Sequence, residues 1–399
     1  MLLAAAVCAC SPGDGVEWKK ATEAGNAALK EDSFERAEEA FVEAVRLAQN
    51  FAPQDPRAKL ARENLASVRW VRNMDKGMAF FKDGDFVRAE PLVRAAVGFA
   101  GELAESMAED FPGLETSLAA LAVVYENTGA TANEEATLRR LLEVRKRTRG
   151  DTHTDVAKTL HALGLACRNQ RKYAEAAAYY EQALKIAHES PSIHPQIGAI
   201  ASNLSIVLDK MGKLGEAEAL FTKSVEILEA AVEPEDPALA LGLYALAGAK
   251  MHQKHYREAR QAFLRNIAIQ EKAFGAEDAG LAFSLNNMSG ALWELGDREG
   301  TLRVLRRALA IREKALGTEH ELVAMTLDNL ALFTGMSGRR ETAESLFLRA
   351  RAIHEKRFGR DSQEFAISLE IHAGMLRHHK RNAEAERLEA EAKAIRAKL

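Results

Sequence analysis

Six isoleucines recur at almost constant intervals from residue 186 to residue 395. The first two are 41 residues apart, and the other four follow at intervals of 42. They are Ile186, Ile227, Ile269, Ile311, Ile353 and Ile395. A fixed period of this size is typical of stacked supersecondary units, in which each unit covers the open apolar face of its neighbour. The chain is therefore expected to be a repeat array.

The composition limits both the fold classes and the kinds of partner that are expected. Only 6% of the 399 residues are aromatic and only 9 are prolines, which favours helices over strands. The formal net charge of -4 argues against nucleic acid, whose phosphates require a basic surface. The sequence contains no run of about 18 apolar residues, so no transmembrane helix is expected.

The neighbours of the isoleucines repeat as well. Alanine recurs as an anchor in the second half of the unit, with a small residue twelve positions before it and an aromatic residue four positions after it. The anchor and aromatic pairs are Ala37/Phe41, Ala176/Tyr180, Ala217/Phe221, Ala259/Phe263 and Ala343/Phe347. Small residues let two helices approach closely, and the aromatic ring fills the gap between them.

This pattern resembles the tetratricopeptide repeat, in the 42-residue form of kinesin light chains. The strings Thr326–Ala331 and Ala310–Gly317 are similar to those repeats, and the likeness covers residues 114 to 395. The resemblance implies an all-α fold, an α-solenoid in which about nine helical hairpins form a right-handed superhelix.

Nine units are expected, in three regions. Residues 1–15 form a tether, 16–110 an N-terminal pair of hairpins with an extended helix, and 111–399 the regular array with a charged C-terminal capping helix. The units start near Val16, Asp55, Pro112, Asp151, Ser192, Asp236, Asp278, His320 and Ser362. The second unit carries about eleven extra residues between Pro56 and Arg69, which lengthen its first helix by almost three turns.

Glycine, proline and short polar residues mark the ends of the expected helices. Glycines should end second helices or form the tight turn inside a hairpin. The first group is Gly275, Gly317 and Gly359, and the second is Gly212, Gly296 and Gly338. Asp278 and Ser362 are expected to cap helix starts, and Pro195 and Pro237 to lie in first turns, where a missing N–H costs nothing.

The opening run resembles the end of a bacterial lipoprotein signal. An apolar segment leads to Ala9 and Cys10, followed by a polar tether containing Gly and Pro. The resemblance implies that the thiol of Cys10 is acylated and attaches the protein to the bacterial cell envelope. The basic region of such signals is missing, which a start codon further upstream would explain. The alternative is an apolar N-terminus on a cytoplasmic protein.

No catalytic constellation emerges, and no cofactor is expected. The sequence contains no phosphate-binding glycine loop, nucleophile elbow or HExxH string. Histidine groups such as His252 with His255 lack the cysteine or carboxylate spacing of a zinc site, so no metal is predicted. Cys167 is expected to be a buried, inert thiol.

The concave surface is the remaining candidate site. In the related arrays, an asparagine on the first helix, just before the conserved apolar position, bonds the backbone of a bound peptide. That position carries asparagine in three of the six regular units, at Asn203, Asn287 and Asn329. An amide both donates and accepts, which suits recognition of an extended segment. Alternatively, these amides satisfy a neighbouring helix carbonyl.

Apolar and aromatic side chains accompany the asparagines on the same helices. The groove-facing set is expected to be Leu241, Tyr244, Met251, Phe283, Asn286, Trp293, Met325 and Met336. Such side chains on a surface indicate a partner site. If the frame is displaced by one residue, they are core instead. Lysine and arginine are sparse in this set, which argues against acidic peptides.

The sequence therefore predicts a non-enzymatic scaffold that binds a peptide segment of a partner protein in its concave groove. The predicted binding residues are Asn203, Tyr244, Phe283, Asn286, Asn287, Trp293 and Asn329. Contact with a membrane is expected only through a lipid anchor at Cys10. The alternative is a cytosolic regulatory protein of the same repeat type that controls an enzyme or receptor.

Overall fold

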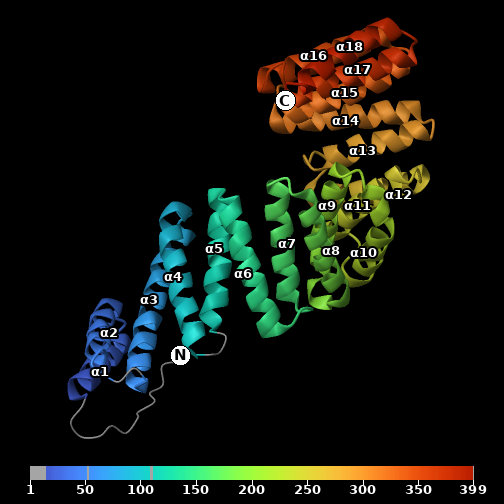
Figure 1. Ribbon diagram of the computed structural model, residues 1–399. Coiled ribbons are helices and arrows are strands. Elements are labelled where there is room, and N and C mark those ends of the chain that lie inside the picture. The colour runs from blue at the N-terminus through green and yellow to red at the C-terminus, as the bar shows by residue number, and fades with distance from the viewer. Residues whose placement is uncertain (1–14, 52–53, 108–110, 399) are drawn as a thin grey trace. The chain divides into compact units, whose positions relative to one another are not determined.

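The computed structural model describes residues 15–51, 54–107 and 111–398, and helices account for most of them (Figure 1). The first nine α-helices are α1 (Val16–Lys30), α2 (Phe34–Ala48), α3 (Pro56–Lys82), α4 (Phe86–Met107), α5 (Pro112–Thr128), α6 (Thr131–Arg149), α7 (Thr154–Asn169), α8 (Tyr173–Glu189) and α9 (Ile197–Lys210). The others are α10 (Glu218–Ala231), α11 (Pro237–His252), α12 (Tyr256–Phe274), α13 (Leu281–Glu294), α14 (Arg298–Leu316), α15 (Glu321–Met336), α16 (Arg340–Phe358), α17 (Gln363–His378) and α18 (Asn382–Arg396). Two 3₁₀ helices, η1 (Pro191–Gln196) and η2 (Leu214–Ala217), precede α9 and α10.

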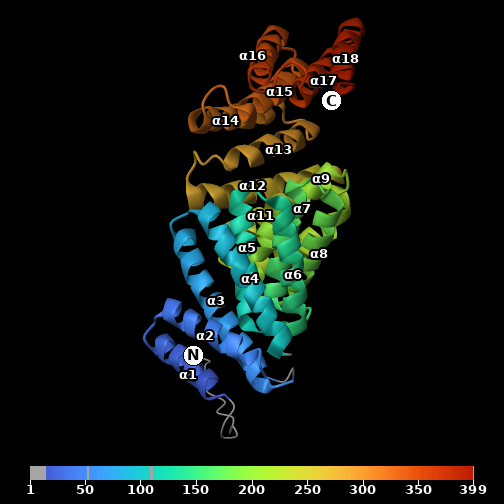
Figure 2. The same ribbon diagram turned by 60° about the vertical axis from the view of Figure 1, so that its left-hand side comes forward.

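The helices pair in sequence as helical hairpins, which Figures 1 and 2 show side by side. Hairpins then pack on one another through the second helix of one and the first helix of the next, as α12 does on α13 and α14 on α15. The described part of the chain holds eighteen α-helices, which form nine successive pairs along the sequence, and no strand. The predicted all-α repeat fold is confirmed.

Several hairpins show the predicted contact between small and aromatic residues. Phe221, Phe263 and Phe347 are fully buried, and so are their anchor alanines or nearly so. In the first hairpin, a methyl group placed on Gly25 would come within 2.6 Å of the Phe41 ring. Only a residue without a side chain therefore allows α1 to approach α2 this closely.

Every hairpin turn contains one residue with positive φ. Five of these residues are glycines, as expected for the left-handed region. The other four are Asp32, Arg171, Lys254 and Lys380, with φ between 53° and 61°. The turn geometry is thus constant, while the residue that adopts it is not.

Pro237 begins α11, as predicted, but the prediction for Pro195 was wrong. Pro195 lies inside η1, a 3₁₀ helix that starts with Pro191, and α9 begins only at Ile197. Two prolines four residues apart remove two backbone N–H donors, so an α-helical ladder cannot form across this stretch.

The long helix of the second unit is also present. α3 spans 27 residues, and Asp55 caps it by accepting a hydrogen bond of 2.8 Å from the backbone N–H of Arg57. Its additional turns pack against the first hairpin, where Ala58 and Ala61 join a cluster with Trp18. The extra residues therefore extend the apolar face of the helix without rotating it.

Exposed ion pairs link successive hairpins at a constant spacing. Carboxylates at hairpin junctions meet lysines 37 residues later, near the ends of second helices. The pairs are Glu235–Lys272, Glu277–Lys314, Glu319–Lys356 and Asp361–Lys398. Such exposed pairs contribute about 0–1 kcal/mol each, so they help to fix the register rather than to stabilise the fold.

The chain divides into two compact units, one up to Tyr179 and one from Tyr180. This division falls within α8, whereas the sequence placed a domain boundary after residue 110, and that boundary stays a prediction. Among the described helices, none combines the length and apolar character needed to cross a membrane.

Candidate peptide-binding surface

A chain of side-chain hydrogen bonds connects three first helices of the C-terminal unit. Nδ2 of Asn287 donates to the hydroxyl of Tyr244 at 2.8 Å, and Nδ2 of Asn329 donates to Oδ1 of Asn286 at 3.0 Å. In both cases the donor is 43 residues after the acceptor, so the same contact is made twice, between α13 and α11 and between α15 and α13. We call these four residues the amide ladder.

The asparagines were expected either to bind a peptide or to bond a neighbouring helix, and the ladder bears on both possibilities. Their amides do bond neighbouring helices, but through side chains rather than the expected backbone carbonyl. Each bond uses one of two N–H groups, and within the described residues no group donates to Oδ1 of Asn329. The ladder therefore retains hydrogen-bonding capacity, and its contact with a peptide stays a prediction. Asn203 lies half-buried on α9.

An exposed row of apolar side chains runs one helical turn before the ladder. It contains one residue from each of α11, α13, α15 and α17, spaced by 42 residues. The row comprises Leu241, Phe283, Met325 and Ile367, which are 36%, 42%, 38% and 39% exposed. Leu241 and Phe283 precede Tyr244 and Asn286 by three residues, a spacing that places them on one helix face. We call this row the apolar stripe.

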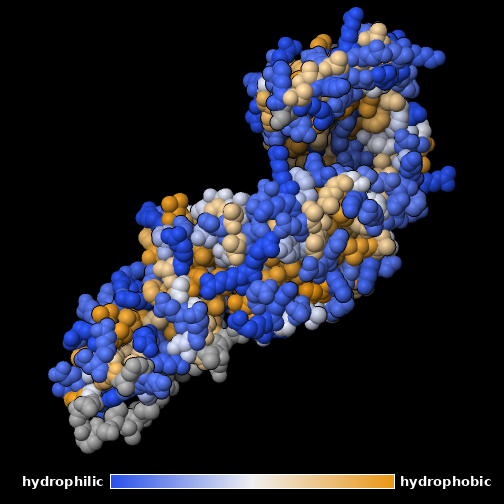
Figure 3. All heavy atoms as spheres, in the orientation of Figure 1, coloured by the Kyte–Doolittle hydropathy of each residue, from blue (hydrophilic) through white to orange (hydrophobic). Residues whose placement is uncertain are grey.

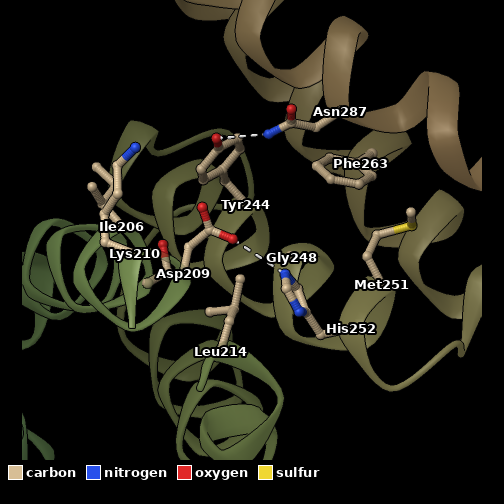
Figure 4. Close-up of a pocket in the computed structure, with 11 residues that line it drawn as sticks. Ile206, Asp209, Lys210, Leu214, Tyr244, Gly248, Met251, His252, Phe263 and Asn287 are labelled. Atoms are coloured by element: carbon tan, nitrogen blue, oxygen red, sulfur yellow. Dashed lines mark hydrogen bonds and ion pairs between the residues drawn. The ribbon is translucent and has the colours of Figure 1, made fainter. Parts of the chain in front are cut away.

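The same unit contains a pocket of about 290 Å³ at the start of the ladder (Figure 4). Its lining comes from α9, α11, α12 and α13, and from η2. Leu214, Met251 and Phe263 give it apolar walls, while Tyr244 and Asn287 place polar atoms beside them. Figure 3 shows that this unit is hollowed and that apolar and hydrophilic atoms both reach the hollow.

Electrostatic contacts are few inside the pocket. Nε2 of His252 lies 3.2 Å from a carboxylate oxygen of Asp209, and both side chains are exposed. Burial raises the pKa of Tyr244, so its hydroxyl stays neutral and can donate as well as accept. The pocket is therefore suited to an apolar side chain bordered by hydrogen-bonding groups.

The prediction of Trp293 as an exposed anchor was wrong. Its side chain is only 9% exposed and packs on the ring of Phe333, with 4.8 Å between the ring centroids. The guanidinium of Arg298 covers the ring at 3.6 Å from its centroid. Trp293 therefore belongs to the core between α13, α14 and α15. Phe283 and Tyr244 remain accessible, whereas Asn286 is nearly buried within the ladder.

The sequence reasoning missed most of the pocket. Ile206, Asp209 and His252 line it without belonging to the predicted set. The sequence does contain one indication of a pocket here. The repeat position that Ile206 occupies carries glycine in the next two units, at Gly248 and Gly290. Glycine has no side chain, so Gly248 leaves space beside the ladder that a larger residue at this position would fill.

Two groups of side chains resemble incomplete metal sites. One is Glu135, Cys167 and Glu175, and the other is Glu218, His255 and Glu258. In the second group Nζ of Lys250 already lies 3.1 Å from Glu218 and 2.5 Å from Glu258.

The carboxylates of the first group are also paired. Lys172 bonds Glu135 at 2.7 Å and holds its pKa at about 2, and Arg139 bonds Glu175 at 2.8 Å. Burial raises the pKa of the Cys167 thiol to about 11, which agrees with an inert thiol. Since cationic side chains bridge the carboxylates in both groups, the arrangements are those of ion-pair networks.

Cys10 and the preceding residues lie outside the described part of the chain.

Family models of the tetratricopeptide repeat match four stretches of the sequence. These are residues 114–189, 198–238, 237–314 and 323–364. A curated protein of Dictyostelium discoideum that contains tetratricopeptide repeats is 29% identical over 143 residues. The match covers 35% of this chain but only 9% of that protein's length.

Solved structures with similar helix arrangements include proteins of two kinds. Kinesin light chain repeats from Podospora anserina are 25% identical and cover 51% of this chain and 97% of that one, with a TM-score of 0.44. The apo form of RapI is 16% identical, covers 96% of this chain and 98% of that one, and has a TM-score of 0.57. A Rap protein in complex with the competence and sporulation factor is 13% identical, covers 96% of each chain, and has a TM-score of 0.50.

Proposed function

Because this chain belongs to the tetratricopeptide repeat family, we propose that it is a non-enzymatic interaction module that binds an extended peptide segment of a partner protein. The binding surface is the row of first helices in the C-terminal unit, from α9 to α17. The observation that carries the proposal is the apolar stripe, which lies one helical turn from the amide ladder.

The two features complement an extended peptide. An extended chain presents backbone N–H and C=O groups that amides can bond whatever the peptide sequence is. Its alternate side chains point to one side, where they can cover Leu241, Phe283, Met325 and Ile367. Exposed apolar side chains in a row, rather than singly, mark interaction sites. The pocket beside Tyr244 would take one larger side chain of the peptide.

One solved structure offers an analogy at the level of the fold. A Rap protein of similar architecture was solved in complex with the competence and sporulation factor. This supports the idea that an array of this kind holds a separate ligand.

The proposal is tested with a phage library of random dodecapeptides selected on the purified chain. Met325→Glu places a charge in the middle of the stripe and should weaken binding of the selected peptides at least tenfold, since a carboxylate cannot be desolvated there without a partner. Leu348→Glu is the matched control, because Leu348 is 63% exposed on the second helix α16 and should leave binding unchanged. If Met325→Glu and Leu348→Glu bind the selected peptides equally well, the peptide does not lie on the apolar stripe.

We also propose that Cys10 tethers the module to a bacterial envelope membrane through acyl chains. The support is the lipoprotein-like run around Cys10. Intact-mass measurement on protein expressed in its native host, with the native upstream sequence, tests this directly. Added acyl mass and loss of residues before Cys10 are expected, and Cys10→Ser should remain in the soluble fraction. An unmodified wild-type protein in the cytosolic fraction would favour the regulatory alternative.

A further inference from the structure

Two arginines of the array occupy equivalent positions but differ in their surroundings. Nη1 of Arg145 donates to the carbonyl of Asp155 and to the hydroxyl of Thr159, at 3.1 and 2.8 Å. Nη1 of Arg312 makes the same two bonds, to the carbonyl of Leu322 and the hydroxyl of Thr326, at 3.0 and 2.5 Å. Both sets of partners lie 10 and 14 residues after the arginine.

Arg145 has a carboxylate partner that Arg312 lacks. Nε of Arg145 donates to Glu115 at 3.0 Å, and Glu115 comes 30 residues earlier. Thirty residues before Arg312 the chain carries Ala282. The guanidinium of Arg312 therefore keeps the hydrogen bonds of its counterpart but not the counter-charge.

In the next unit, the residue at the equivalent position has a carboxylate partner that comes from a different place in the sequence. His354, one period after Arg312, bonds the buried Asp328 at 3.0 Å. Asp328 comes 26 residues before His354, and 26 residues before Arg312 the chain carries the neutral Asn286. Neither of the two positions that supply a carboxylate elsewhere in the array supplies one here.

Arg312 is consequently a buried and unpaired charge. Its side chain is 1% exposed, and its Nε and Nη2 have no hydrogen-bond partner in the described chain. Burial lowers its pKa to about 10, so the guanidinium still carries its proton at neutral pH. Isolated buried charges are costly, and buried charges in folded proteins are ordinarily paired with an opposite charge.

The side chain that covers Arg312 belongs to the apolar stripe. Cζ of Arg312 lies 4.7 Å from the ring centroid of Phe283, which is itself 42% exposed. Phe283 thus separates the buried guanidinium from the surface on which the peptide is proposed to lie. A rotamer change of this one side chain would uncover the part of the guanidinium that its ring contacts.

We propose that Arg312 binds a carboxylate of the peptide that lies on the apolar stripe, with Phe283 moving aside to admit it. Nε and Nη2 form one edge of the planar guanidinium, and an edge of this kind matches the two oxygens of a carboxylate. The carboxylate comes from an aspartate or glutamate side chain or from the C-terminus of the peptide. This inference rests on the proposed function and specifies the chemistry of its ligand.

The test uses two libraries of random octapeptides, one with free C-terminal carboxylates and one with C-terminal amides. Bound peptides are identified by mass spectrometry. If a side chain supplies the carboxylate, the wild-type chain should enrich Asp or Glu at one position in both libraries. If the C-terminus supplies it, the free-acid library alone should yield tight binders.

Arg312→Met should abolish that preference and weaken the selected peptides about tenfold or more, because the charge-assisted bonds are lost. Its melting temperature should be equal to or above the wild-type value, since an unpaired buried charge is replaced by an apolar chain of similar length. Arg306→Met is the matched control, because Arg306 is exposed on the same helix α14 and should leave the preference intact.

Ala282→Glu provides a second variant that leaves Arg312 in place. It supplies the carboxylate that Arg145 receives from Glu115, and should compete with the peptide and remove its carboxylate preference. Peptides that bind in a Met325-dependent manner without any carboxylate preference would overturn the inference and leave the proposed function standing. If the chain selects no peptide from either library, both fail.

Discussion

Phe263→Ala is the most direct test of how the array holds together. Phe263 is 1% exposed, lines the pocket, and meets the ring of Tyr244 edge to face at a centroid distance of 6.2 Å. Truncation of a buried phenylalanine costs about 3–5 kcal/mol. Since 1.4 kcal/mol is a factor of ten, amide exchange in the affected helices should become about two to three and a half orders of magnitude faster.

The location of the effect is as informative as its size. In a repeat array each unit contacts only its neighbours, so protection should fall in α11, α12 and α13 and remain in α1–α6. Hydrogen exchange with mass spectrometry resolves this helix by helix, which a single unfolding midpoint of a 399-residue chain does not. Leu264→Ala is the control at the adjacent position, which is 45% exposed and should change protection little. A uniform loss along the chain, or no loss in α11–α13, would refute this account of the packing.

Three further variants test individual features. The double variant Asn287→Ala with Asn329→Ala removes two ladder bonds and should lower stability by about 1–3 kcal/mol in thermal melts, so unchanged melting would contradict the ladder. Lys254→Gly relieves a left-handed backbone (φ 60°) and should raise stability by about 1 kcal/mol, whereas a decrease would show that the lysine stabilises the turn. Burial raises the pKa of Glu134 from 4.5 to about 7, so the folded state holds a proton that the unfolded state releases, and stability should fall by up to about 3 kcal/mol as pH rises from 4.5 to 7. Glu134→Gln should remove that part of the pH dependence, as melts across this range would show.

The fold was predictable because the period repeats every local signal several times. Phe221, Phe263 and Phe347 occupy the same position of the repeat, and all three are buried as predicted. Because several units define that position together, one irregular unit does not change the prediction. The turns were predictable only where glycine marks them. Lys254 and Lys380 adopt the same left-handed conformation without any compositional signal, because the flanking helices impose it.

The site was predictable in part, for a physical reason. Residues of the ladder and stripe repeat along the first helices, so one repeat frame predicts Asn287 and Phe283 to be exposed on the same helix, and both are. Their contact with a peptide stays a prediction. Exposure of a given side chain depends instead on partners far away in sequence, as Phe333 is for Trp293. Arg312 was missed because the arginine itself is unremarkable. Its significance comes from the missing carboxylate at position 282, which emerges only once Glu115 is seen to pair with Arg145.

A non-periodic charge on a periodic surface has a consequence for recognition. The stripe presents four apolar side chains at equal sequence intervals, and a peptide shifted by one unit would meet nearly the same contacts. Periodic contacts therefore provide affinity but do not define where along the array a peptide binds. A carboxylate bound at Arg312 would fix that register, because the equivalent position is balanced by Asp328 one unit later and is the neutral Gln270 one unit earlier. On the proposed mode of binding, loss of Arg312 should thus leave peptides attached in several registers as well as more weakly, and a photo-crosslinker at one peptide position should then label more than one first helix.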